Sequence, residues 1–161
     1  MKINNMKDYM LSKEKYFIDR YLYLLRREEN FKSKNGLINN FFNKFYERKK
    51  NKLGIKLGFV IPAFTLKENV KICHIGNIII NSNAVIGNNC KLHGSNCIGN
   101  KGTTQDSPII GNNVDIGFGA ILIGNIKISD NCKIGAGAVV TNSFETPGAT
   151  IVGIPAIQIE R

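Results

Sequence analysis

The sequence is poor in the residue types that bind metals. It contains two histidines, His74 and His93, and only four cysteines. None of these residues stands in a CxxC motif or in the Cys/His spacing of a metal site, so we expect no bound metal. The cysteines are therefore interpreted as buried, reduced thiols of a cytosolic protein; they are Cys73, Cys90, Cys97 and Cys132.

Long apolar segments are also absent. No run approaches the roughly 20 apolar residues that a membrane-spanning helix needs. The N-terminus lacks the apolar stretch of a secretory signal peptide. Both absences lead us to expect a cytoplasmic protein.

Acidic residues are scarce in the first third of the chain. Residues 1–60 hold 15 Lys or Arg against six Asp or Glu, whereas residues 61–161 hold seven against six. The net charge of +10 therefore belongs almost entirely to the N-terminal segment. This excess falls on two predicted helices without a nucleic-acid-binding motif, which argues against nucleic acid as a partner. Peripheral contact with the anionic inner face of a membrane stays open as an alternative.

Residues 1–58 are predicted to form a helical hairpin. Over residues 6–30, apolar side chains such as Phe17 and Tyr21 recur at helical spacing with charged residues between them. A second helix is expected over residues 37–51 and is expected to end at Gly54 and Gly58. Its apolar face is interpreted as a packing or subunit-contact surface, formed by Ile38, Phe41, Phe42 and Phe45.

A six-residue repeat dominates the rest of the chain. A period of six fits neither a helix nor a single strand, and hexapeptide repeats are typical of a parallel β-helix solenoid. A second series of mostly small residues, including Cys90 and Cys132, stands four positions after each repeat residue. The repeat residues are all aliphatic: Ile80, Ile86, Leu92, Ile98, Ile110, Ile116, Leu122, Ile128, Ile134 and Val140.

The repeat slips by two residues near the first histidine. An earlier series, which includes Ile72, is out of phase with the main one, so two residues must be inserted between Ile72 and Ile80. With about 18 residues per turn, we expect Ile72, Leu92 and Ile110 to occupy the same corner on successive turns. The two histidines, His74 and His93, closely follow this corner. They are therefore expected on one face of adjacent turns, about 4.8 Å apart.

Two further segments stand out from the repeat. Residues 101–107 form a polar loop that is expected to leave the coil and return in phase, and such loops often contact substrates. After the last repeat, Pro147 and Gly148 turn the chain outward, and residues 151–156 form a closing apolar segment.

The repeat resembles the hexapeptide-repeat acyltransferases. The resemblance covers about 100 residues from Ile61 onward and is similar to the serine acetyltransferase-like branch, closest to its short members that O-acetylate bacterial surface polysaccharides. The segments that carry it are HIGNIIIN (74–81), AVIG (84–87), PIIGNNV (108–114), GNIKI (124–128), IGAGAVV (134–140) and VGIPA (152–156).

The resemblance implies a mainly β fold, a left-handed β-helix over residues 59–161 preceded by the helical segment 1–58. It also implies an acetyl-CoA-dependent O-acetyltransferase that acts on a hydroxyl of a capsular or O-antigen polysaccharide or its precursor. Coenzyme A is expected in a groove between subunits of a homotrimer. The residues implied in its binding are Phe118, Ala136, Thr141 and Asn142.

In this family the residue matching His74 is the general base. A histidine with a pKa near neutrality suits the removal of a hydroxyl proton, while backbone N–H groups stabilise the thioester oxyanion. We expect direct transfer in a ternary complex, in which His93 helps to hold the acceptor or the intermediate. Asp106, in the polar loop, is the candidate to orient His74.

Two departures from serine acetyltransferases favour a larger acceptor than free serine. The family has an Asp about fifteen positions before the base, where this chain has Phe59. The family also has a substrate-site histidine just before the proline matched by Pro108, where this chain has Ser107.

Three alternatives remain. The first is a serine O-acetyltransferase of cysteine biosynthesis, and the second is a non-enzymatic solenoid scaffold that does not bind acetyl-CoA. The third is a zinc carbonic anhydrase of the same fold, but that site needs three histidine ligands and the chain has two.

Overall fold

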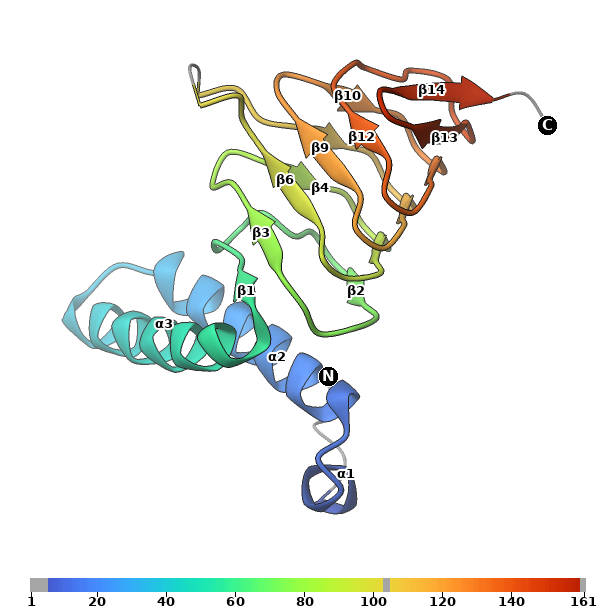
Figure 1. The fold of residues 1–161 in the computed structure, drawn as a ribbon. Helices are drawn as coiled ribbons and strands as arrows, with labels where there is room; N and C mark the ends of the chain where they lie inside the picture. The colour runs from blue at the N-terminus through green and yellow to red at the C-terminus, as the bar shows by residue number, and fades with distance from the viewer. Residues whose placement is uncertain (1–5, 103–104, 160–161) are drawn as a thin grey trace.

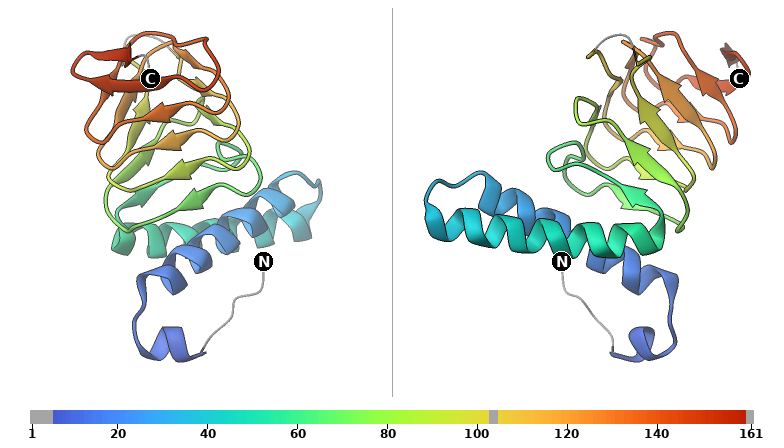
Figure 2. Two further views of the ribbon diagram at one scale, coloured as in Figure 1. Left: turned by 90° about the vertical axis from the view of Figure 1, so that its right-hand side faces the viewer. Right: turned by 60° about the vertical axis from the view of Figure 1, so that its left-hand side comes forward.

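The chain folds into a three-sided coil of short strands, with helices packed across its first turn. The computed structural model describes residues 6–102 and 105–159. Figure 1 shows the helices against the end of the coil where β1 (Phe59–Val60) begins, and Figure 2 shows the strands stacked in successive turns. The predicted parallel β-helix preceded by a helical hairpin is confirmed.

The N-terminal segment contains α1 (Met6–Met10), α2 (Glu14–Lys32) and α3 (Leu37–Leu57). The single helix predicted over residues 6–30 is wrong, because the chain turns between α1 and α2, where Ser12 adopts a left-handed conformation with a φ of 50°. The second helix extends to Leu57, beyond its predicted end at Asn51. None of the described helices is long and apolar enough to cross a membrane.

Gly54 lies inside α3 and does not end the helix as predicted. A Cβ atom there would lie 2.5 Å from the carbonyl oxygen of Phe59 and 3.1 Å from the ring of Tyr21. The missing side chain therefore lets α3 pack closely against β1. Gly58 ends the helix in the left-handed conformation, with a φ of 78°.

The strands form three sheets, one for each face of the coil. The five-stranded sheet has the order β1-β3-β6-β9-β12, the six-stranded sheet β14-β13-β11-β8-β5-β2, and the three-stranded sheet β10-β7-β4. All their printed pairs are parallel except that of β13 with β14. The remaining bounds are β2 (Lys71–Ile72), β3 (Ile78–Ile80), β4 (Val85–Ile86), β5 (Lys91–Leu92), β6 (Cys97–Gly99), β7 (Ile109–Ile110), β8 (Asp115–Ile116), β9 (Ile121–Ile123), β10 (Lys127–Ile128), β11 (Lys133–Ile134), β12 (Val139–Val140), β13 (Thr150–Gly153) and β14 (Ala156–Ile159).

The register between turns confirms the predicted two-residue slip. Ile80 pairs with Ile98, which is the regular spacing of 18 residues. Ile72 pairs with Leu92, so the turn that contains His74 holds two extra residues. These residues enlarge the connection between β2 and β3.

The next turn is longer than predicted. Leu92 pairs with Ile116, not with Ile110, so this turn spans 24 residues. Ile110 instead pairs with Ile86, on a different face. The prediction treated the polar loop as one ordinary repeat of the coil. In the structure the loop lies outside the strands, and it accounts for the six added residues.

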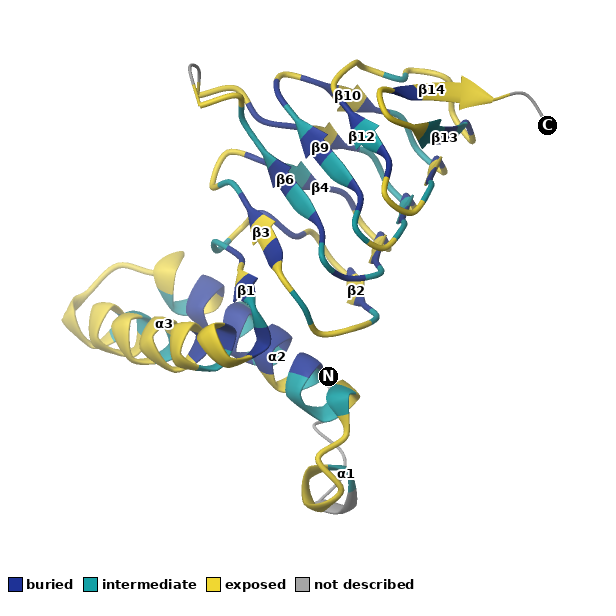
Figure 3. Cartoon of the chain, in the orientation of Figure 1, coloured by how far each residue is buried: buried dark blue, intermediate teal, exposed yellow. Residues whose placement is uncertain are grey.

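The core of the coil is the aliphatic repeat itself. All ten repeat residues are at most 3% exposed, and burial of each such side chain contributes about 1.5–3 kcal/mol to folding. Figure 3 shows this buried lining along the inner side of the strands. Cys90 and Cys132 are fully buried within the small series, as predicted.

Asparagines close the edge of the coil between the three-stranded and six-stranded sheets. Asn89, Asn113 and Asn131 adopt a positive φ of 56–62°, a conformation that asparagine tolerates better than most residues. The preceding residues bond across turns: the Asn112 side chain accepts the N–H of Asn88, and Asp130 accepts that of Asn112. These bonds fasten each turn to the next.

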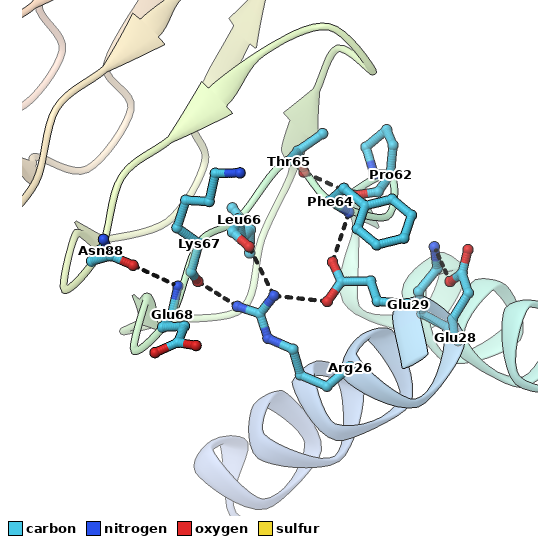
Figure 4. Close-up of polar contacts among 11 residues, drawn as sticks. Arg26, Glu28, Glu29, Pro62, Phe64, Thr65, Leu66, Lys67, Glu68 and Asn88 are labelled. Atoms are coloured by element: carbon cyan, nitrogen blue, oxygen red, sulfur yellow. Dashed lines mark hydrogen bonds and ion pairs between the residues drawn. The ribbon is translucent and has the colours of Figure 1, made fainter. Parts of the chain in front are cut away.

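Polar contacts fasten α2 to the first turn of the coil (Figure 4). The Arg26 guanidinium donates to the carbonyl oxygens of Leu66 and Lys67, at 2.8 and 2.5 Å. Glu29 accepts the N–H of Phe64 at 2.7 Å and also pairs with Arg26 at 2.8 Å. Because these bonds satisfy backbone groups that no strand reaches, α2 has a fixed position on the coil.

The apolar face predicted on α3 is exposed in the single chain. Ile38 is 74% exposed and Phe41 is 67% exposed. Figure 3 shows this side of α3 as a continuous exposed surface. The helix instead packs on α2 through its other side, where the Phe31 ring stacks on Tyr46 with centroids 5.5 Å apart.

A buried ion pair joins the two long helices. The Lys50 ammonium lies 2.8 Å from the Glu28 carboxylate and donates to the carbonyl oxygen of Ile61 at 3.1 Å. Both side chains are at most 5% exposed. Removing one partner would leave the other charge buried without compensation.

We predict that Lys50→Met lowers the free energy of unfolding by about 3–5 kcal/mol, measured by urea denaturation. The control, Lys44→Met on the exposed side of α3, should change it by less than about 0.5 kcal/mol. The double variant Glu28→Leu/Lys50→Met should recover most of the loss, because it buries no unpaired charge. Equal effects of Lys50→Met and Lys44→Met would contradict a structural role for this pair.

Candidate active site

His74 lies on the edge of the coil where the chain passes from the six-stranded to the five-stranded sheet. We call this the histidine edge; it comprises residues 73–77, 93–96, 117–120 and 135–138 on successive turns. The His74 side chain is 60% exposed. The extra two residues fall in the first of these connections, so the slip widens the edge at the histidine.

Gly94 leaves a space beside His74. A Cβ atom at Gly94 would lie 3.4 Å from the Cβ of His74 and 3.3 Å from the ring of Phe118. Gly94 also has a φ of 119°, which few other residues adopt. The absent side chain therefore keeps open a position between an exposed imidazole and an exposed aromatic ring.

A carboxylate from the helical segment meets His74. The Glu14 Oε2 atom lies 3.3 Å from Nδ1 of His74, and the Oε1 atom accepts a short hydrogen bond from the N–H of Ile75. Asp106, the candidate from the sequence, lies in the polar loop on another edge. Glu14 is separated from His74 by 60 residues, and no local motif pointed to it.

His93 has a different partner. Its Nε2 atom lies 2.7 Å from Oδ1 of Asp115, on the next turn, and the Lys91 ammonium lies 3.7 Å from the other oxygen of Asp115. The register places Gly94, rather than His93, beside His74. The imidazole of His93 is thus already held by a carboxylate within the coil.

The four residues implied in coenzyme A binding lie on two edges. Phe118 and Ala136 share the histidine edge and lie one above the other, because Ile116 pairs with Ile134. Thr141 and Asn142 are exposed beyond β12, on the edge that leads to the three-stranded sheet. One chain therefore does not bring the two pairs together at one edge.

The polar loop lies on this second edge. The Ser107 hydroxyl donates to Oδ1 of Asn81 at 3.0 Å, and the Asn83 amide donates to the carbonyl oxygen of Gln105 at 2.8 Å. The Lys101 stem packs beside Gly124 on the following turn. Thr103 and Thr104, within the loop, lie outside the described residues.

Phe59 cannot replace the aspartate of the related enzymes. It is 3% exposed, and its ring packs against Tyr21 with centroids 5.1 Å apart. This apolar contact joins α2 to β1. The position therefore serves the packing of the helices on the coil.

A cavity of about 610 Å³ opens beside Glu14 and Ile75. This volume lies within the range of ligand pockets. Its lining is strongly basic, and aromatic rings complete the walls. The main lining residues are Arg20, Lys49, Lys52, Lys56, Tyr16 and Phe17.

The sequence is similar to serine acetyltransferases. It is 33% identical over 103 residues to that of Buchnera aphidicola subsp. Schizaphis graminum, and 34% identical over 102 residues to that of Synechococcus elongatus. These alignments cover 62% of this chain but only 39% and 41% of the relatives. The chain thus spans about two fifths of the length of these relatives. No family model matches the sequence.

Solved serine acetyltransferases share the fold. The soybean apoenzyme superposes with a TM-score of 0.74 at 24% identity, over 94% of this chain and 60% of that chain. The Brucella abortus strain S19 enzyme in complex with coenzyme A gives 0.75 at 22% identity, over 89% and 56%. The Neisseria gonorrhoeae enzyme in complex with serine gives 0.72 at 25% identity, over 89% and 57%.

These comparisons confirm the left-handed β-helix and the resemblance to hexapeptide-repeat acetyltransferases. They contradict the predicted polysaccharide acceptor, because the relatives and neighbours named above are serine acetyltransferases. The prediction gave too much weight to the replacements at Phe59 and Ser107 and to the short helical segment. The matched proteins support the serine alternative instead.

Thiol reactivity offers a test of the edge geometry. Burial raises the pKa of the Cys90 and Cys132 thiols, which lowers the thiolate fraction at any given pH. Cys73 and Cys97 are partly exposed, and Cys73 directly precedes His74. We predict that iodoacetamide at pH 7.5 labels Cys73 and Cys97 first, as read by peptide mass spectrometry. Labelling of Cys90 and Cys132 should require urea, and their rapid labelling in the folded protein would contradict this burial.

Proposed function

We propose that this chain is an acetyl-CoA-dependent O-acetyltransferase that acetylates the hydroxyl group of L-serine. The observation that carries the proposal is the exposed His74 imidazole, which stands beside the open space at Gly94 on a coil shared with serine acetyltransferases. The enzymes from Brucella abortus and Neisseria gonorrhoeae are named with coenzyme A and with serine respectively, and both ligands are carried to this chain as part of the proposal.

The proposed reaction transfers acetyl directly. His74 accepts the hydroxyl proton of serine as the serine oxygen attacks the thioester carbonyl carbon. The carbon–sulfur bond then breaks, and the leaving coenzyme A thiolate takes the proton back from the imidazolium. Backbone N–H groups of the histidine edge are the donors available to the oxyanion. No covalent enzyme intermediate is needed.

His93 has a supporting role in this proposal. Because Nε2 of His93 is already paired with Asp115, we assign it to holding the acceptor and not to proton transfer. The basic cavity beside Glu14 favours the approach of an acceptor that carries a carboxylate, as serine does.

The coenzyme A site is proposed to form between copies of the chain in a trimer. Phe118 and Ala136 would line it from one copy, and Thr141 and Asn142 from the neighbouring copy. This division is supported by their positions on two edges of the coil. The domain boundary between residues 58 and 59 is kept within this proposal, with the exposed face of α3 as a further subunit contact.

Turnover with L-serine tests the acceptor. We predict that acetyl-CoA and L-serine together release free coenzyme A thiol and yield O-acetylserine, detected by thiol titration and mass spectrometry. Release without serine should stay at the background hydrolysis rate. Acetyl-CoA binding without serine-dependent turnover would overturn the acceptor, while the lack of any binding in calorimetry would favour a non-enzymatic scaffold.

Replacement of the base should act on the chemical step. We predict that His74→Ala lowers kcat by about 10²–10⁴-fold, the usual contribution of a general base. His93→Ala should instead act mainly through the KM for serine, because it removes a binding contact. Near-normal kcat in a folded His74→Ala protein would rule out the assignment of His74.

Phe118 should contribute to coenzyme A binding. We predict that Phe118→Ala raises the Kd of acetyl-CoA by about 5–30-fold, because an exposed aromatic ring is lost from the site. Phe41→Ala is the matched control, since this ring is similarly exposed but lies on α3. Equal Kd values for both variants in calorimetry would place the coenzyme elsewhere.

A further inference from the structure

We propose that Glu14 is the positioning residue of the catalytic base, so that the N-terminal helical segment completes the active site. This inference rests on the proposed function of His74. It starts from the contact between Oε2 of Glu14 and Nδ1 of His74, at 3.3 Å. The related enzymes are expected to use an aspartate that this chain lacks, because Phe59 stands at that position in the apolar core.

The chemistry of the pair fixes the tautomer of His74. An ionised carboxylate can only accept hydrogen bonds, so Nδ1 must carry the proton that faces Glu14. In the neutral ring Nε2 is then unprotonated and can accept a proton from the acceptor hydroxyl. After the proton transfer, the same carboxylate stabilises the imidazolium. Glu14 thus acts through His74 and does not itself take part in proton transfer.

Glu14 also fixes the backbone next to His74. Its second oxygen, Oε1, accepts the N–H of Ile75 in a short hydrogen bond. One carboxylate therefore holds both the imidazole and the adjacent peptide group. This two-point contact falls in the connection enlarged by two residues, where no strand hydrogen bond restrains His74.

The position of Glu14 is determined by the anchoring of α2 on the coil. Glu14 is the first residue of α2, directly after the turn at Ser12. Arg26 and Glu29 bind the backbone between Phe64 and Lys67 (Figure 4), about 18 Å away along the helix at 1.5 Å per residue. Tyr21 packs on Phe59 between these two points. α2 is therefore a rigid element that carries Glu14 to the histidine edge.

The first test measures the tautomer and needs no substrate. Nitrogen-15 NMR of the neutral imidazole should show the Nδ1–H form for His74 in the unmodified protein and a tautomer mixture in Glu14→Ala. The chain has only two histidines, so a His93→Gln variant assigns the signals. A His74 ring that is protonated at Nε2 in the unmodified protein would overturn the inference.

The second test separates the chemical step from binding. Glu14→Gln, which keeps the size of the side chain, should lower kcat by about 10–100-fold with the KM values for acetyl-CoA and serine within about twofold. Glu14→Asp should recover part of kcat, because it restores the charge with a shorter reach. Asp19→Asn is the matched control, since Asp19 lies on the same helix and pairs with Lys15 on the surface. An unchanged kcat in Glu14→Gln would overturn the proposed role.

A double-variant cycle distinguishes this inference from the proposed function. Glu14→Gln should cause no further loss in the His74→Ala background, because the two residues act as one unit. Equal additional losses in both backgrounds would assign Glu14 a separate structural role. If His74→Ala retains full activity, the proposed function fails, whereas a loss only in His74→Ala removes Glu14 alone.

Discussion

The structure depends on the hydrogen-bonded register between successive turns of the coil. Each turn must place an aliphatic side chain beneath the one before it, as Ile98 lies against Ile80, because the interior has room for one such layer per turn. Residues beyond the regular 18 cannot enter the interior and must leave at an edge. Two extra residues leave beside His74, and six leave in the polar loop. The chemistry is assigned to these places because the regular turns have no freedom to form a site.

The helical segment solves a problem that the coil cannot solve alone. A connection enlarged by two residues lacks strand hydrogen bonds, so an imidazole on it would have no fixed orientation. The contacts of Arg26 and Glu29 with the first turn hold α2, and α2 brings Glu14 to His74. Replacing the expected aspartate by Phe59 improves the packing of Tyr21 on β1. The same substitution thus strengthens the helix contact and transfers the role of the carboxylate to that helix.

Periodic features of this chain could be predicted from the sequence, and long-range contacts could not. The ladder from Ile80 to Val140 and the slip after Ile72 are local counts, and both are confirmed. The length of the next turn was mispredicted, because a loop of six residues is indistinguishable from one more repeat in a count of sixes. Glu14 was missed since its partner lies 60 residues away and its approach depends on the helix break at Ser12.

The acceptor was mispredicted for a related reason. The replacements at Phe59 and Ser107 were interpreted as the loss of a serine site, because motif positions were treated as independent. The structure relates each to a compensating contact, since Glu14 supplies a carboxylate near His74 and Ser107 bonds to Asn81. A catalytic arrangement is defined by where groups meet in space, and one carboxylate can replace another from a distant element. A missing motif residue is therefore weak evidence against an activity when a neighbouring helix can deliver the same group.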